Sequence, residues 1–567
     1  MKVPLEGDTS AAVVHAPQQA SRDALNVCDL LIVGGGTGGV AAAIAAARYG
    51  IKVCLIEETD WLGGQFTAQG VSALDEHEHI ENFGGTASYY EFRDRIRGHY
   101  RGMTQNPARS GEFNSGRCWV SRLAFEPKVA VRVVGDMLDQ ARKSGRLTVL
   151  FRTKAFAVIR DGDRIKSVSC LNWDTRQTAT FEPRFVIDAT ELGDFLALAE
   201  VEHVVGAESI SETGEPSGHP RGHQEDCVQS YTYTFALERR PATENNIIAK
   251  PDQYERNRSR QPYSLEIDVH GGEIYAEESG RLQYSLFRQM PGTKGSLWTY
   301  RRLIDAAQFA AFPHDITMFN WPGNDYRDGN LLTLQPREIA AALQRAKLVS
   351  LGFLYWLQTE APVGNGAAGA PELRLRKDVM DTSDGLSKFP YIRESRRIRA
   401  LQTVLEQDVS AKFVHGIRAA HFVDAVGIGW YPIDIHRSSS PEEVGMSART
   451  KPFQIPLGAL IPRNTSNLIA GGKNIGTTHI TNGCYRLHPV EWNVGEAAGH
   501  LCAYAVTHGD SPRNIRDDPQ RLRSFQKGLL EAGIPIVWRT DVGVTHSRFA
   551  AAQLEYMAHP EKFRDRL

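Results

Sequence analysis

A glycine-rich turn between two apolar runs is the feature that most constrains the fold of this chain. Residues 29–58 read DLLIVGGGTGGVAAAIAAARYGIKVCLIEE. The first apolar run is typical of a buried parallel strand, and the alanine-rich run has helical composition. The second apolar run predicts another strand. A strand, a helix and a strand in this order predict a parallel sheet.

The glycine spacing in this segment predicts that the turn binds a dinucleotide. Gly34, Gly36 and Gly39 match GxGxxG, and Glu57 ends the second strand 23 residues after Gly34. Gly34 permits a tight turn, Gly36 lets the backbone approach a pyrophosphate, and Gly39 lets the helix pack closely on the strand. The helix N-terminus offers free N–H groups to phosphates, and Glu57 can accept hydrogen bonds from a ribose. A glycine-rich turn without a ligand is the alternative, and the complete fingerprint disfavours it.

The residues after Glu57 favour FAD over NAD. The stretch WLGGQFT places Gly63, Gly64 and Gln65 directly behind the acidic strand end. This pattern resembles the large family of FAD-dependent oxidoreductases with a glutathione-reductase-like FAD domain, which are distantly similar to fumarate reductase flavoproteins. In that family an LGG loop approaches the flavin ring. The resemblance therefore implies FAD as the cofactor.

A second stretch resembles the same family. Residues 185–199 read FVIDATELGDFLALA, similar to the strand and ATG-type turn that close over FAD. Ala189, Thr190 and Asp194 are its candidate contacts. The family commonly has glycine after Ala-Thr, whereas this chain has Glu191. The alternative is a strand-to-helix turn capped by threonine or aspartate.

A third stretch, residues 467–499, resembles the family segment in which the chain comes back to the cofactor. NLIAGGKNIG is similar to the last strand of the FAD domain, with Gly472 and Asn474 as candidate contacts. Pro489 suits the first turn of a following helix. The resemblance implies that this helix points at the pyrimidine edge of the flavin. Its backbone N–H groups near Glu491 and Trp492 would then stabilise negative charge on the reduced ring.

The same helix carries two glycines on one face. Gly495 and Gly499 are four residues apart, so they share a face that is expected to lie flat against a strand or a planar ring. For Glu491 the alternative is a favourable partner of the helix dipole, and for Trp492 it is packing.

The polar residues before this helix are the catalytic candidates. His479 is the first candidate for the base, His488 is the second, and Arg486 would orient an anionic or carbonyl oxygen. A histidine in a turn can instead serve as a cap or a hydrogen-bond partner, and Arg486 can instead form an internal ion pair.

Three further stretches supply candidates for substrate binding. DEHEHIENFGG follows the LGG loop, NWPGNDY is dense in hydrogen-bonding groups, and YIRESRR resembles a family element beside the active site, with DIHR adding charge. The candidate residues are His77, His79, Asn320, Tyr326, Arg393 and His436. The alternative for RESRRIR is a solvated helical face with internal ion pairs. A metal site at DEHEH is disfavoured, because no distant ligand set accompanies it. His77, His79 and Cys484 are also candidate anchors for covalent flavin.

Three separated segments are expected to build one domain. The predicted fold is α/β, a Rossmann-like FAD-binding domain of three-layer type with an inserted α+β substrate or cap domain. The predicted divisions are a flexible leader (1–26), the first part of the FAD domain (27–205), the substrate or cap domain (206–449), the C-terminal part of the FAD domain (450–508) and a helical extension (509–567).

Composition narrows the class of partner. The chain has 567 residues and a formal net charge of -2, so no global field attracts nucleic acid or an anionic membrane. Seven dispersed cysteines form no CxxC pair and suit a reducing compartment. No run of 18 apolar residues and no signal-peptide pattern is present, so a cytoplasmic protein is expected.

These observations predict an FAD-dependent dehydrogenase or oxidase that acts on a small molecule. It would remove a hydride from a C–H bond next to oxygen or nitrogen. A flavin monooxygenase reduced by NAD(P)H and a flavin-bound scaffold without turnover stay open as alternatives. The substrate, the electron acceptor and a homo-oligomeric state also stay open.

Overall fold

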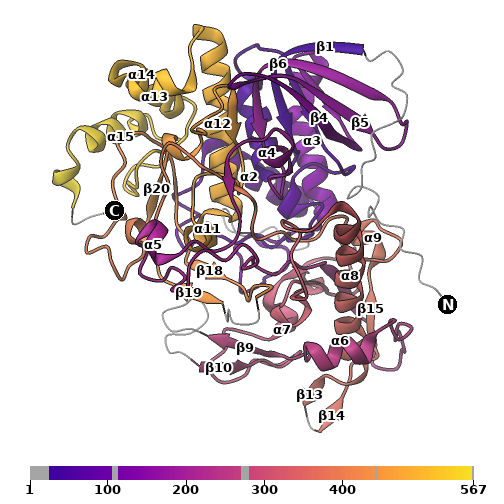
Figure 1. Ribbon diagram of the computed structural model, residues 1–567. Coiled ribbons are helices and arrows are strands. Elements are labelled where there is room, and N and C mark those ends of the chain that lie inside the picture. The colour runs from indigo at the N-terminus through magenta and orange to yellow at the C-terminus, as the bar shows by residue number, and fades with distance from the viewer. Residues whose placement is uncertain (1–23, 105–112, 270–279, 365, 441–444, 565–566) are drawn as a thin grey trace.

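The computed structural model of the chain describes residues 24–104, 113–269, 280–364, 366–440, 445–564 and 567. Figure 1 shows a large sheet beside the long helix α12 in the upper part of the molecule, and a second layered region around α8 in the lower part. The two regions have separate hydrophobic clusters. One combines N-terminal and C-terminal segments, and the other lies between Leu192 and Ile392.

The large sheet has seven strands, in the order β3-β2-β1-β6-β5-β4 with β21 paired to β6. The strands are β1 (Ala24–Val33), β2 (Val53–Ile56), β3 (Leu147–Leu150), β4 (Thr153–Asp161), β5 (Arg164–Asn172), β6 (Thr178–Asp188) and β21 (Leu468–Ala470). β1, β2, β3, β6 and β21 are parallel, whereas β4 and β5 form an antiparallel hairpin that continues into β6. The parallel strands are short apolar runs, as expected for strands covered on their faces. The predicted α/β class is confirmed.

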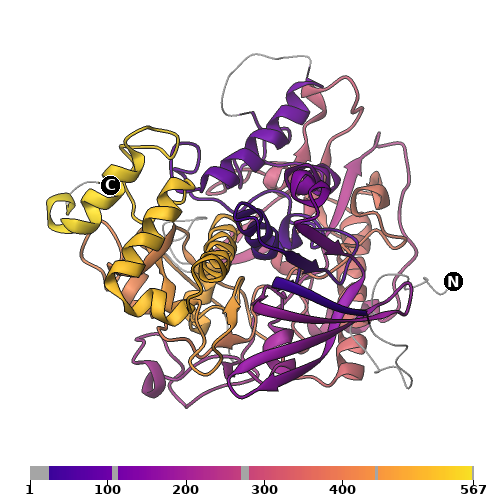
Figure 2. The same ribbon diagram turned by 90° about the horizontal axis from the view of Figure 1, so that it is seen from above.

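Three helices cover the parallel strands. They are α1 (Thr37–Ala47), α3 (Pro127–Lys143) and α12 (His488–His508). α1 contacts α3 and α12, and α12 also contacts β1, β6 and β21. The view from above in Figure 2 shows α12, in orange, close to the indigo N-terminal helix. α12 therefore brings the C-terminal part of the chain onto the turn formed by its N-terminal part.

The second region is built on an antiparallel sheet with the strand order β11-β12-β8-β15. Its strands are β8 (Phe235–Arg239), β11 (Arg302–Ile304), β12 (Ile316–Phe319) and β15 (Leu373–Leu375). The long helix of this region is α8 (Pro336–Thr359), which starts with a proline in its first turn. Its buried face contributes to the cluster of this region.

Short elements complete the fold. The described part of the chain also contains two-stranded pairs: β9 (Glu266–Val269) with β10 (Gly280–Gln283), β13 (Pro362–Gly364) with β14 (Ala367–Ala368), β7 (His203–Val204) with β16 (Arg397–Ile398), β17 (Ala425–Gly429) with β20 (Phe453–Pro456), and β18 (Ile433–Ile435) with β19 (Met446–Ala448). The remaining α-helices are α2 (Ala87–Arg101), α4 (Asp194–Leu198), α5 (Ile210–Thr213), α6 (Tyr254–Arg260), α7 (Leu297–Tyr300), α9 (Lys377–Met380), α10 (Glu406–Val409), α11 (His479–Tyr485), α13 (Pro512–Asp517), α14 (Pro519–Glu531) and α15 (Phe549–Ala558). Among the described helices, none is long and apolar enough to cross a bilayer.

Two expectations differ from the structure. The first strand begins at Ala24, inside the expected leader, because its backbone already pairs with β6 there. RESRRIR is not a solvated helical face. Tyr391 is bridged to Thr232, and Arg393 and Arg397 are buried. The domain boundaries themselves remain predictions.

Candidate active site

The glycine turn after β1 is packed too tightly for side chains. Gly34 has φ +99°, and a Cβ there would overlap the carbonyl oxygen of Ala189 at the end of β6. A Cβ on Gly39 would overlap the carbonyl oxygen of Gly34. Gly36 is the N-cap of α1. The turn and the helix N-terminus therefore present bare backbone to the groove beside them, which we call the cofactor groove.

Glu57 closes one side of the cofactor groove. Its carboxylate accepts a 2.7 Å hydrogen bond from the Gly35 N–H, and it also accepts from the Thr59 N–H and hydroxyl. Burial raises the pKa of Glu57 to about 7, although these hydrogen bonds oppose the shift. Thr190 lines the groove as well, together with Ala189. The carboxylate is thus held at the position where the fingerprint expects a ribose partner.

The second glycine loop supplies orphaned polar atoms. Gly63 and Gly64 both have positive φ, which fits their need for glycine. Gln65 donates from Nε2 to the carbonyl oxygen of Arg486 at 2.8 Å and contacts Glu491. Within the described part of the chain, Gln65 Oε1 and Gln69 Nε2 are buried without a hydrogen-bond partner. Such atoms normally have partners, so a polar ligand fits here.

An ion cluster reaches the groove through Glu191. The Oε1 atom of Glu191 lies where a side chain on Gly36 or Gly64 would begin. The Lys473 ammonium pairs with Glu191 and, at 3.2 Å, with Glu491. Burial raises the pKa of Glu491 to about 7, with Lys473 opposing it. Glu191, which the resemblance did not explain, therefore reaches the groove.

The start of α12 differs from the expectation in detail. Pro489 lies in the first turn, as predicted. The Glu491 N–H, however, donates to the Leu487 carbonyl inside the helix, so it is not free for a flavin. Trp492 packs against Phe66 and donates its indole N–H to Ser88, so its alternative reading as a packing residue fits.

The glycine face of α12 contacts a helix. A Cβ on Gly495 would overlap the backbone of Gly38, and a Cβ on Gly499 would overlap the backbone of Ala42. Both partners belong to α1. The expectation of a strand or a planar ring against this face is wrong, because the two glycines serve close helix–helix packing.

Three further cofactor candidates have protein partners. Asp194 pairs with Arg396 at 3.0 Å and with Lys154 at 3.3 Å. Asn474 accepts from the Gly472 N–H and donates to the Asp188 carbonyl. Asn474 therefore connects the segment after β21 to the end of β6, next to the groove residue Ala189.

Arg486 also lines a separate cavity of about 560 Å³, which we call the arginine pocket. Its lining includes six arginines and four carboxylates. The structure brings three of the predicted substrate residues together here, namely Asn320, Arg393 and His436. The Arg486 carbonyl accepts a hydrogen bond from Gln65, which directly follows the groove residue Gly64, so Arg486 links the pocket to the groove.

Three other predicted substrate residues lie outside this lining. His77 and His79 stack against Trp430, and burial lowers the pKa of His77 to about 3. Tyr326 donates its hydroxyl hydrogen to the Asp328 carbonyl. Of the DEHEH stretch, Asp75 rather than a histidine reaches the pocket. Within the described residues, no group of three or more His, Cys, Asp and Glu side chains could hold a metal ion.

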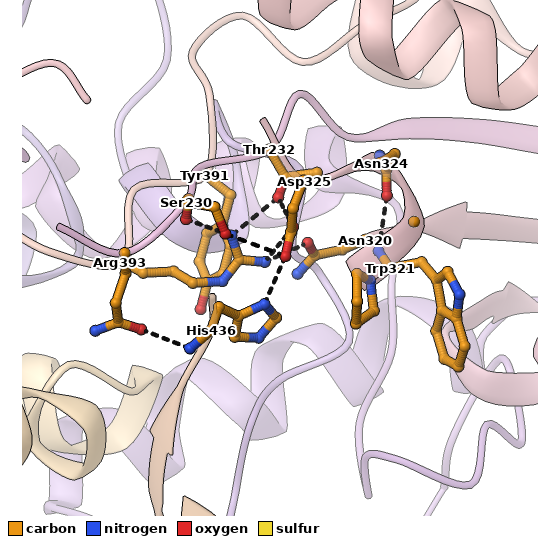
Figure 3. A network of polar contacts seen from close by, with 12 residues as sticks. Ser230, Thr232, Asn320, Trp321, Asn324, Asp325, Tyr391, Arg393 and His436 are labelled. Atoms are coloured by element: carbon orange, nitrogen blue, oxygen red, sulfur yellow. Dashed lines mark hydrogen bonds and ion pairs between the residues drawn. The ribbon is translucent and has the colours of Figure 1, made fainter. Parts of the chain in front are cut away.

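Asp325 is the centre of the polar network in the pocket (Figure 3). The Nδ1–H of His436 donates to its Oδ2 at 2.7 Å, and Arg393 lies 3.1 Å from its Oδ1. Ser230 and Thr232 donate to the same carboxylate. Burial alone would raise the pKa of Asp325, but Arg393 and His436 outweigh it and hold this pKa far below its usual range. Asp325 is thus a fixed anion that orients His436.

The two predicted bases are tied to protein partners. His488 accepts the Asp75 N–H at Nδ1 and donates from Nε2 to the Val71 carbonyl. Burial lowers its pKa to about 4. His479 bonds Glu394 at 3.0 Å; burial would lower its pKa, but Glu394 and Cys227 raise it well above the usual value.

Sequence reasoning missed several residues of the pocket. Asp325, Tyr391 and Asp434 lie inside the stretches already selected, so their density of polar groups was the available signal. Arg301, which pairs with Asp75 at 2.8 Å, carried no such signal. Its approach to the site depends on a β-sheet of the second region.

A family model described as FAD dependent oxidoreductase matches residues 29–529. The chain belongs to this family. FAD is therefore its cofactor, and the glycine cradle and the orphaned glutamine atoms of the cofactor groove fit it. A search of curated proteins finds no match.

Solved structures with similar folds are distant from this oxidoreductase. p-Nitrophenol 4-monooxygenase PnpA from Pseudomonas putida DLL-E4 is 10% identical, with 95% of this chain and 92% of that chain covered and a TM-score of 0.35. A geranylgeranyl bacteriochlorophyll reductase-like protein from Thermoplasma acidophilum is 11% identical, with 94% and 88% covered and a TM-score of 0.29. L-Proline dehydrogenase from P. horikoshii is 15% identical, with 35% and 28% covered and a TM-score of 0.18. At these TM-scores the likenesses carry no argument about the reaction.

Proposed function

We propose that this oxidoreductase is a dehydrogenase or oxidase that removes a hydride from a C–H bond next to oxygen or nitrogen of a small molecule. The observation that carries the proposal is the His436–Asp325 pair in a pocket that Arg486 links to the cofactor groove. Such a reaction needs a proton acceptor beside the reacting carbon as well as a hydride acceptor.

Residues of the groove would hold the cofactor. Glu57 would accept hydrogen bonds from ribose hydroxyls, and the N-terminus of α1 would bind the pyrophosphate. Gln65 and Gln69 offer buried polar atoms for the rest of the molecule. When bound, FAD supplies the acceptor for the two electrons of the hydride.

His436 is the base in this proposal. Its Nδ1–H is held by Asp325, so the neutral ring carries its lone pair on Nε2. Nε2 lies 3.8 Å from the nearest Asp434 oxygen, which is beyond hydrogen-bond distance. After Nε2 takes a proton from the substrate, the ionised Asp325 stabilises the imidazolium.

The proposal replaces the bases expected from sequence. Both ring nitrogens of His488 already bond the backbone, so no lone pair faces the pocket. His479 has a raised pKa and therefore holds its proton near neutral pH. Arg486 keeps its expected role of orienting a substrate oxygen, since it lines the pocket with 2% of its surface exposed.

Anaerobic mixing of the FAD-loaded protein with alcohols and amines tests the proposal. At least one compound should bleach the flavin without NAD(P)H. His436→Gln should slow the bleaching, whereas the exposed His508→Gln should not. Bleaching by NAD(P)H alone would favour the monooxygenase. No bleaching by any reductant except dithionite would favour the scaffold.

A further inference from the structure

In the arginine pocket the acidic groups are already paired, whereas several hydrogen-bond donors are not. Three acids of the lining already have a cation: the buried Asp75 has Arg301, the buried Asp325 has Arg393, and the half-buried Asp434 has Arg486. The acceptors of the pocket floor are thus largely used. The contacts that the pocket can offer a ligand therefore depend on the side-chain N–H and O–H groups that have no protein acceptor.

Both terminal nitrogens of Arg393 have protein partners. Nη1 donates to the Ser230 carbonyl and the Thr232 hydroxyl, and Nη2 donates to Asn320 Oδ1 and forms an ion pair with Asp325 at 3.1 Å. Arg393 therefore positions its neighbours rather than binding a ligand. Because Asn320 Oδ1 accepts from a guanidinium, the amide orientation is fixed and its Nδ2–H₂ group remains as a donor in the pocket lining.

Arg486 and Tyr391 form a second pair of donors. Arg486 Nη1 donates one hydrogen to the Tyr391 hydroxyl at 3.1 Å, and Nη2 is taken by Asp434. The second hydrogen of Nη1 and the hydroxyl hydrogen of Tyr391 remain. Two donors about 3 Å apart match the two oxygens of one carboxylate.

We propose that the substrate is a carboxylate, bound by Arg486, Tyr391 and Asn320, and that the hydride is removed from a carbon near this carboxylate. The assignment rests on the proposed function, since it takes the arginine pocket as the substrate site. A carboxylate accepts from all three groups, whereas a neutral amide or alcohol leaves part of them unpaired. A carboxylate bound in this way would lie between Arg486, whose carbonyl bonds Gln65, and the side of the pocket that holds His436.

Binding of simple anions to the FAD-loaded, oxidised full-length protein tests the assignment without turnover. The probes are propionate, its neutral isostere propionamide, and inorganic phosphate, followed by perturbation of the visible flavin spectrum and by calorimetry. Propionate should bind saturably and at least roughly tenfold more tightly than propionamide. Equal binding of the two, or binding of phosphate alone, overturns the proposal.

Four variants sharpen the result. Tyr391→Phe should weaken propionate binding roughly tenfold and Arg486→Gln roughly 100-fold, while Tyr355→Phe, outside the pocket, should leave it unchanged. Asp434→Asn should tighten binding, because it removes the anion that competes for Arg486. A merely structural role of this ion pair predicts weaker binding in Asp434→Asn, and that result contradicts the proposal. FAD content of each variant reports its folding.

The outcomes separate this inference from the proposed function. If propionate binds as described but no hydroxy or amino compound bleaches the flavin, the carboxylate site stands and the dehydrogenase proposal fails. If neutral alcohols or amines bleach the flavin while carboxylates neither bind nor compete, the dehydrogenase stands and the carboxylate site fails.

Discussion

The cofactor groove and the arginine pocket are linked through Arg486, and they differ in how they are built. The glycine turn of the groove presents bare backbone, because Gly34 and Gly39 leave no room for a Cβ beside neighbouring carbonyls. The pocket is made of long charged side chains held by ion pairs, with Asp325 and Arg393 at its centre. If the proposed assignment holds, the difference teaches that shape selects the cofactor and charge selects the substrate. The two should therefore fail through different changes.

The largest effect is expected from filling the groove. Gly34→Ala places a Cβ against the Ala189 carbonyl at a positive φ, so FAD should not be retained. Gly50→Ala is the matched control, since Gly50 also has positive φ but nothing within 4 Å of a Cβ. Visible absorbance of the purified proteins measures the FAD content. Full FAD in Gly34→Ala would contradict the tight-turn account.

A loss of the pocket base should leave FAD in place. His436→Gln should lower kcat/KM for the reducing substrate by roughly 100- to 10,000-fold, because it removes the proton acceptor. Asp325→Asn should act in the same direction, since it removes the anion that orients the ring. Steady-state kinetics with FAD content as the reference measures both. Unchanged kinetics in His436→Gln would remove this residue from the mechanism.

His488, at the start of α12, bonds the backbone of Asp75 and Val71, and its protonation should weaken the whole protein. Its pKa is lowered from 6.5 to about 4 by burial, so its contribution is complete above pH 6.5 and is lost as the pH falls through about 4. The loss amounts to about 3 kcal/mol of unfolding free energy. In urea titrations between pH 7 and 4, His488→Gln should lose less stability than the wild type. An equal loss in both proteins would show that His488 does not carry this pH dependence.

The smallest effect is expected at the ribose end of the groove. Glu57→Gln keeps the shape and replaces one carboxyl oxygen with an amide donor, so the Kd for FAD should rise roughly tenfold. Fluorescence titration of the FAD-free protein measures it, with Glu182→Gln, which is exposed and outside the groove, as the comparison. A rise of more than a thousandfold would mean that charge, not only shape, selects the cofactor.

The groove could be predicted from sequence because its determinants are local. Gly34, Gly36, Gly39 and Glu57 fall within one βαβ unit, where spacing alone sets position. The pocket could be predicted only in part. Asn320, Arg393 and His436 come from separate loops, and polar density selected them without showing that Asp325 joins them.

The residues whose partners differ from the expectation share a physical cause. The backbone N–H groups near Glu491 and Trp492 were assigned to the cofactor by their place at the start of a helix. A helix start does not tell which face of the helix meets the groove. Trp492 faces an aromatic cluster, and the Glu491 N–H is already bonded. The histidines at 479 and 488 were chosen by residue type, whereas their burial and partners decide their protonation.

The most direct test of the account is the anaerobic reaction of the FAD-loaded protein with a panel of hydroxy and amino acids, compared with their amides, without NAD(P)H. The account predicts that a member of the carboxylate panel bleaches the flavin and that His436→Gln abolishes most of this rate. Bleaching that requires NAD(P)H, or that proceeds equally in His436→Gln, would contradict it.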